Sequence, residues 1–121
     1  MNGKLRNIVT VLFCIISVIS YSQSDTSKNA NPELTLYKSA CKLIDSSKYK
    51  ESIPILKKAI KIKSDYIEAY NKMAFAKMKL EDYKGAEKDI LQAVKIAPDN
   101  FESHKMLGIL YFDTKKYKEA K

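Results

Sequence analysis

The chain matches itself when it is shifted by thirty-four positions, the distance in sequence from Tyr49 to Tyr83. A backward shift places Tyr83 on Tyr49 and Ala93 on Ala59, and a forward shift places Tyr83 on Tyr117. A period of this length is typical of a repeat protein, in which one unit is too small to bury its own apolar side chains and needs its neighbours to cover them. The period therefore constrains the fold class more than any single segment does.

From Pro32 onward the apolar residues recur every three or four positions, and no stretch alternates with the period of two that a strand requires. The spacing predicts five helical stripes, over residues 36–44, 53–60, 70–77, 83–96 and 104–111. Short polar connectors are expected at residues 45–49, 63–65, 81–83, 97–100 and 113–117. Because connectors this short make neighbouring helices antiparallel, we expect an all-α superhelix of antiparallel helix pairs, about two and a half repeats long.

Small residues recur at equivalent places in the predicted helices. They are Ala40, Ala74 and Gly108 in the first helix of each unit, and Ser52, Ala86 and Ala120 in the second. Helices approach closely only where side chains are small, so these positions are expected to lie at helix crossings. Tyr49, Tyr83 and Tyr117 are expected to fill the space beside them.

Four further features bear on the helix ends and on possible sites. Pro54 lacks an N–H and is costly in a helix interior, but a helix start near residue 50 or 51 puts it about one turn in, where the loss has little consequence. Asn100 is expected to cap the following helix, and the acidic pair at residues 81–82 is expected to be solvated. His104 is expected to fill a packing slot rather than bind a metal, because metal sites need several ligands.

These residues resemble the tetratricopeptide repeat (TPR), and the resemblance covers residues 33–121. The clearest copy is residues 67–100, where Tyr83 and Ala86 stand at the family's Tyr-x-x-Ala and Pro98 stands at its terminal Pro. The third copy has the family's Leu-Gly-x-x-Tyr in "LGILY". The resemblance implies a degenerate first repeat at 33–66, a second at 67–100, and a third at 101–121 that is truncated just inside its second helix.

The resemblance also implies a binding site. In this family the first helix of each repeat lines a concave groove that holds an extended peptide or a partner helix. The groove residues carried over are Tyr37, Cys41, Glu68, Asn71, Phe75, Met78, Lys105, Ile109 and Phe112, with Leu34, Ile44 and Glu102 in the same columns. Asn71 and Lys105 are expected to hydrogen-bond a peptide backbone or carboxylate. The alternative for the apolar members is that they pack against chain beyond Lys121.

The N-terminus has the layout of a secretory signal peptide. Lys4 and Arg6 precede an apolar run over residues 8–19, and Ser20 and Ser22 are suitable small residues before a cut near Gln23. We expect a signal peptide at 1–22 and a flexible linker at 23–32. The alternative is an uncleaved anchor, although a spanning helix needs about 20 apolar residues. The predicted location is the periplasm or cell envelope of a bacterium, or secretion, and association with the envelope is left open.

Charge and cysteine content narrow the function classes. The formal charge of the full chain is +8, and its one arginine lies in the predicted signal. The remaining basic residues are lysines scattered among acids, which favours a solvated face over nucleic-acid binding, because bidentate contacts to bases and phosphates favour arginine. Cys41 is the one cysteine after the signal, so no internal disulfide is expected.

No catalytic constellation, phosphate-binding loop or metal-ligand cluster is visible in the sequence. We therefore expect a non-enzymatic interaction module without cofactor, metal or small-molecule substrate, whose partner is a protein or peptide. The alternative is the N-terminal repeat region of a larger exported protein, with a downstream enzyme or a cell-wall or outer-membrane anchoring domain.

Overall fold

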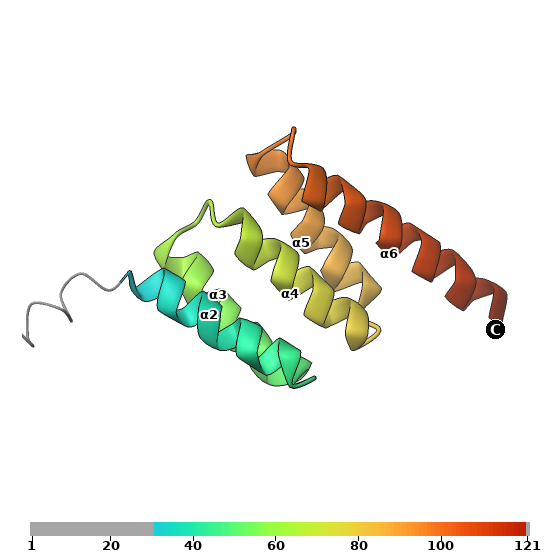
Figure 1. Ribbon diagram of the computed structural model, residues 1–121. Coiled ribbons are helices and arrows are strands. Elements are labelled where there is room, and N and C mark those ends of the chain that lie inside the picture. Colours follow the sequence, from blue (N-terminus) through green and yellow to red (C-terminus); the bar gives the residue numbers. More distant parts are fainter. Residues whose placement is uncertain (1–30, 121) are drawn as a thin grey trace, which may run out of the picture. The chain divides into compact units, whose positions relative to one another are not determined.

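The computed structural model describes residues 31–120, and from Pro32 onward they form helices joined by short turns (Figure 1). The helices are α2 (Pro32–Asp45), α3 (Tyr49–Ile62), α4 (Ile67–Lys79), α5 (Tyr83–Ile96) and α6 (Phe101–Ala120). The described residues contain no strand, which confirms the all-α prediction. None of these helices is long and apolar enough to cross a membrane. The predicted signal peptide and all but the end of the predicted linker lie outside the described residues.

The helices pack in chain order as antiparallel pairs. Helix α2 packs on α3 and α4 packs on α5, and the pairs join through α3 against α4 and α5 against α6 (Figure 1). Two apolar clusters hold this stack together, one centred on Leu56 and one on Ile90, and both side chains are fully buried. The helix pairing that the repeat period predicted is therefore confirmed.

The small residues explain why the helices approach so closely. Ala40, Ala74, Ser52 and Ala86 are all completely buried. The buried Ser52 hydroxyl donates a hydrogen bond to the Tyr49 carbonyl at 2.7 Å, so a serine is tolerated where the other copies have alanine. Such contacts confirm the crossing positions predicted for the first two repeats.

Gly108 does not follow this pattern, and its predicted place at a helix crossing is wrong. Gly108 is exposed, and a Cβ added there would meet no atom within 4 Å. Within the described residues no helix covers this face of α6 at Gly108.

The predicted connector at 113–117 is also wrong, because α6 runs unbroken from Phe101 to Ala120. The turns after α2 and α4 both use a residue with positive φ, Ser47 at 59° and Glu81 at 63°, one period apart. The left-handed conformation costs a non-glycine residue about 1–2 kcal/mol. In the first two repeats this cost is offset when the following helix docks. At Lys115, the equivalent residue, the chain stays helical instead.

Helix ends follow side-chain chemistry. The Asn100 carboxamide oxygen accepts the Ser103 backbone N–H at 2.9 Å, which confirms the predicted cap. Asp82 does the same at the start of α5, where it accepts the Gly85 N–H at 3.0 Å. A Cβ on Gly85 would clash with that carboxylate. Both acids at residues 81–82 are exposed as expected, and Asp82 caps α5 in addition.

Two other local expectations need correction. Helical hydrogen bonding in α3 begins when Ser52 N–H donates to the Lys48 carbonyl, so Pro54 lies in the second turn and removes a bond that Lys50 would accept. Both residues are exposed, so water can hydrate that carbonyl. His104 is exposed rather than packed, and its Nε2 donates to the Pro98 carbonyl at 2.7 Å. The ring therefore fastens the turn before α6.

A shielded ion pair connects α4 to α5. Lys77 interrupts the apolar stripe of α4, and its Nζ lies 2.7 Å from Oδ2 of Asp89. The two side chains are only 15% and 10% exposed. Burial raises the pKa of the Asp89 carboxyl, while the Lys77 ammonium acts in the opposite direction. The charge in this stripe is thus part of the packing between two helices.

Candidate functional site

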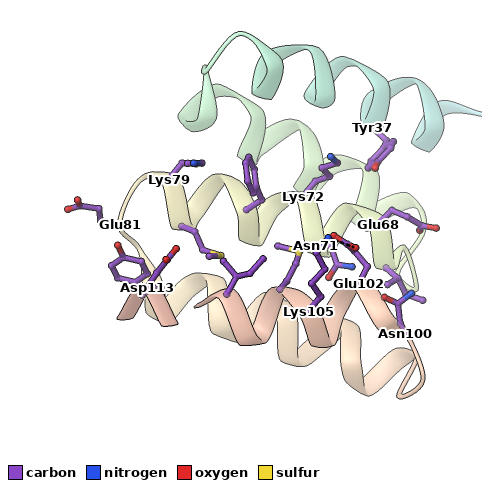
Figure 2. A pocket seen from close by; sticks show the side chains of 16 residues that line it. Tyr37, Glu68, Asn71, Lys72, Lys79, Glu81, Asn100, Glu102, Lys105 and Asp113 are labelled. Atoms are coloured by element: carbon purple, nitrogen blue, oxygen red, sulfur yellow. Dashed lines mark ion pairs between the residues drawn. The ribbon is translucent and has the colours of Figure 1, made fainter. Parts of the chain in front are cut away.

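A groove with a volume of about 710 Å³ lies between α4 and α6 (Figure 2). Helices α4 and α6 form its two long walls, Tyr37 of α2 and Tyr83 of α5 contribute side chains, and the turn residues Glu81 and Asn100 lie at its ends. The repeat period produces this arrangement, because equivalent faces of α4 and α6 point to the same side of the stack.

The floor of the groove is apolar. It is formed by Phe75 and Met78 of α4 and by Met106 and Ile109 of α6. The Phe75 ring meets Tyr49 edge to face, with centroids 6.2 Å apart, so it is held from the α3 side. Ile109 keeps 44% of its surface exposed. An aliphatic side chain open to water inside a concave surface is a favourable contact for an apolar ligand group.

Charged side chains lie along the rim and at the ends. Figure 2 shows Glu68 and Glu102 near one end, and Glu81 and Asp113 near the other. The lysines are partly engaged, because Lys105 Nζ lies 3.5 Å from Glu102 Oε2 and Lys79 Nζ lies 5.4 Å from the centroid of the Phe75 ring. These exposed contacts are weak and can rearrange around a ligand.

A buried polar network fixes the wall near Asn100. The Asn71 amide donates to the Ser103 hydroxyl at 3.1 Å, and that hydroxyl lies 3.1 Å from Asn71 Oδ1 and 2.9 Å from Asn100 Oδ1. Since a hydroxyl has one hydrogen, it donates to only one of these oxygens at a time. Asn71 and Ser103 are both buried. The amide predicted to contact a peptide therefore also joins α4 to α6.

Tyr37 lines the groove from the α2 side. Its ring packs on Tyr66 with centroids 5.2 Å apart and a tilt of 37°. Burial raises the pKa of the Tyr37 hydroxyl far above its ordinary value, and the neighbouring Cys41 adds to the effect. The phenol stays neutral near pH 7, so it offers a ligand both a hydrogen-bond donor and an acceptor.

Most of the residues predicted for the groove lie along it. Those that line it are Tyr37, Glu68, Asn71, Phe75, Met78, Lys105 and Ile109, together with Glu102. Cys41 and Phe112 are not among the lining residues, since Cys41 is half-buried beside Tyr37 and Phe112 is 69% exposed on α6. Whether any of these residues contacts a partner stays a prediction.

The sequence reasoning missed other lining residues, which are Ile67, Lys72, Lys79, Glu81, Tyr83, Asn100, Met106 and Asp113. Four of them are repeat equivalents of one another, since Lys72 aligns with Met106 and Lys79 aligns with Asp113. Glu81 and Asn100 lie in turns, outside any column of the first helices. Among the residues that the structure describes, no group of three His, Cys, Asp or Glu side chains could hold a metal ion.

Comparison with known proteins agrees with this geometry. The family model of the tetratricopeptide repeat matches residues 67–100, which comprise α4, the turn after it and α5. A search of curated protein sequences gave no significant match. The family model thus identifies the middle repeat, which is also the one that supplies the α4 wall of the groove.

Solved structures extend the similarity to most of the chain. MamA from Desulfovibrio magneticus RS-1 aligns with 89% of this chain at 18% identity and a TM-score of 0.66, and an RS-1 MamA double mutant does so with a TM-score of 0.65. The TPR2AB domain of yeast Sti1, solved as a complex with pHSP90, aligns with 93% at 17% identity and a TM-score of 0.68.

The chain spans 64% of the length of each MamA structure and 44% of the Sti1 structure. At these identities the likeness concerns the fold. Residues 67–100 are therefore a tetratricopeptide repeat, and the described part of the chain has the α-helical superhelix fold of proteins built from such repeats.

Proposed function

We propose that this chain is an exported protein-interaction module that holds a peptide or a partner helix in the groove between α4 and α6. The observation that carries the proposal is the apolar floor of that groove. The floor is built from two helices, and it lies in a groove with a volume of about 710 Å³. Its side chains are Phe75, Met78, Met106 and Ile109. Met106 is already buried, and the exposed parts of the other three side chains are stabilised when a partner removes them from water.

The polar surroundings support the same function. Lys72, Lys105 and Glu68 stand around the apolar floor, where they can orient a partner by hydrogen bonds and ion pairs (Figure 2). The buried link from Asn71 to Ser103 keeps the two walls at a fixed spacing before any partner arrives. A preformed site loses less conformational entropy on binding. The Sti1 structure, solved with pHSP90, also supports a protein partner.

Partner capture with a matched pair of variants tests the groove. Ile109 in the groove is 44% exposed, and Leu91 on α5 outside it is 46% exposed. Ile109→Ser is expected to reduce capture of partners from the envelope fraction at least threefold, whereas Leu91→Ser is expected to leave it unchanged. Each variant removes a similar exposed aliphatic group, so equal losses in both would contradict a role for the groove.

The N-terminal segment supports export. It combines Lys4 and Arg6 with an apolar run over residues 8–19 and small polar residues after it. Expression in a bacterial host is expected to yield a mature chain that begins near Gln23 and is found outside the cytoplasm. Mass spectrometry of the intact product measures the cut, and replacing Val11 and Ile15 by aspartate is expected to abolish it. An intact N-terminus on the wild-type product would show that the segment is not a cleaved signal.

A further inference from the structure

The groove differs in charge from the protein around it. Four acidic residues and three lysines line it, so its formal charge is −1, whereas the full chain has a formal charge of +8. The four acids are Glu68, Glu81, Glu102 and Asp113. A locally acidic groove in a basic protein favours cationic groups at close range, even though the distant field of the protein repels them.

The acids stand in two pairs rather than in one cluster. Glu68 of α4 and Glu102 of α6 lie near one end of the groove, and Glu81 and Asp113 lie near the other (Figure 2). The apolar floor lies between the two pairs. One lysine is already opposed by an acid, since Lys105 faces Glu102 at 3.5 Å. Lysines also line the groove, with Lys105 against Glu102 and Lys79 over the Phe75 ring, so the acids exceed the cations by one charge and stand at the two ends of the apolar floor.

The distance between the pairs follows from helix geometry. Thirteen positions separate Glu68 from Glu81, and eleven separate Glu102 from Asp113. At about 1.5 Å per residue, the separation of Glu102 and Asp113 within α6 corresponds to about 17 Å, and Glu68 to Lys79 at the end of α4 spans the same eleven positions. An extended peptide advances about 3.3 Å per residue, so two of its residues that are five or six positions apart match this distance.

An extended segment spans the two acidic pairs with about six or seven residues, whereas a helix needs about twelve to fourteen at about 1.5 Å per residue. We therefore take the shorter, extended segment as the occupant of the groove. A single extended strand is thinner and places alternate side chains on the apolar floor. Lys72 on the α4 wall and Asn100 at one end offer polar groups to the backbone of such a strand.

From these observations we infer that the groove binds an extended peptide with an apolar centre and a lysine or arginine at each end, five or six positions apart. The inference rests on the proposed function and specifies the chemistry of its partner. One cationic residue faces Glu68 and Glu102, and the other faces Glu81 and Asp113. The apolar residues between them cover Phe75, Met78 and Ile109.

Fluorescence anisotropy with three labelled peptides tests this charge pattern on the unmodified protein. The peptides share a five-residue apolar centre and end in lysine, glutamine or glutamate at both sides. The lysine-ended peptide is expected to bind at least tenfold more tightly than the glutamate-ended peptide, with the glutamine-ended peptide between them. Raising the salt concentration from 50 to 300 mM is expected to narrow the difference. The overall charge of +8 alone favours the opposite order, so the ranking separates the groove from the general field.

Charge-neutralising variants locate the effect. Glu68→Gln with Glu102→Gln, and separately Glu81→Gln with Asp113→Asn, are each expected to weaken the lysine-ended peptide about threefold to tenfold. Binding of the glutamine-ended peptide is expected to stay unchanged, which shows that each variant is folded. Glu51→Gln with Glu119→Gln is the matched control, since both residues are exposed and lie outside the groove.

The outcomes separate the inference from the proposed function. Equal or tighter binding of the glutamate-ended peptide, or equal losses in the control variant, overturns the inference and leaves the groove as a binding site. Failure of all three peptides overturns the inference as well. If Ile109→Ser also leaves partner capture unchanged, the proposed function fails with it.

Discussion

The ion pair between α4 and α5 yields the sharpest prediction about stability. Lys77 Nζ and Asp89 Oδ2 are 2.7 Å apart, and the side chains are only 15% and 10% exposed. At an effective dielectric constant of about 20, the gross attraction at that distance is about 6 kcal/mol. Removing both ions from water costs several kcal/mol each, so the pair as a whole contributes little net stability.

Removing one partner has a different effect from removing both. Asp89→Leu leaves the Lys77 ammonium without its counter-charge between two helices, and removing one partner of a buried pair costs about 3–5 kcal/mol. Because Lys77 retains 15% exposure and its long side chain can reach water, we expect a loss at or just below the lower end of that range, about 2–3 kcal/mol. Lys77→Met is expected to cost a similar amount, since it leaves the carboxylate unpaired.

The double variant, Lys77→Met with Asp89→Leu, is expected to lie within about 1 kcal/mol of the parent chain. Urea unfolding followed by far-UV circular dichroism measures all four free energies of unfolding and completes the double-mutant cycle. Lys88→Met on the exposed side of α5 is the control and is expected to change stability by less than about 0.5 kcal/mol. Additive losses in the double variant would refute the reasoning, because they would show that the two charges do not depend on each other.

Two further predictions concern pH and the first turn. Burial raises the folded-state pKa of Asp89, so the folded protein binds this proton more tightly than the unfolded chain does. The resulting stabilisation is fully present below the unfolded pKa of about 3.9, and it is lost as the pH rises through the higher folded value. The free energy of unfolding of the wild-type chain relative to Asp89→Asn is therefore expected to be greater at pH 3 than at pH 7 in urea titrations, and a difference of the opposite sign would contradict the assignment. Ser47 has a φ of 59° and is exposed, so Ser47→Gly is expected to raise the free energy of unfolding by about 0.5–1 kcal/mol. Ser46→Gly, one residue earlier and without a positive φ, serves as its control in thermal melts, where a lower midpoint for Ser47→Gly than for the wild type would count against relief of strain.

The repeat pattern predicted the main contacts of the fold because packing between helices depends on side-chain size at regular intervals. Ala40, Ala74 and Ala86 are fully buried where the repeat period placed them. The same regularity brings the equivalent faces of α4 and α6 to one groove, which is why most of the residues carried over from the family's columns lie along it. The connectors within the first two repeats and the Asn100 cap were also predicted, because they depend on local polar side chains.

Polar partnerships could not be predicted in this way, since each depends on a residue from another helix. Lys77 reads as an interruption of an apolar stripe until Asp89, twelve positions later, lies beside it. Asn71 reads as a free ligand-binding amide, yet it shares a buried hydrogen-bond network with Ser103 of α6. The acids at the groove ends include Glu81, a turn residue that no helix period places.

By itself, the sequence determined the helical period and the buried faces of the first two repeats, because these follow from local periodicity and side-chain volume, while the groove was implied by the family resemblance. The tertiary structure decided where charges find partners and whether a turn forms at all. Residues 113–117 have the composition of a connector, yet α6 continues through them to Ala120. A left-handed turn residue is stable only when the helix beyond it buries enough apolar surface to offset its strain, and that balance is a property of the packed molecule rather than of the turn's own residues.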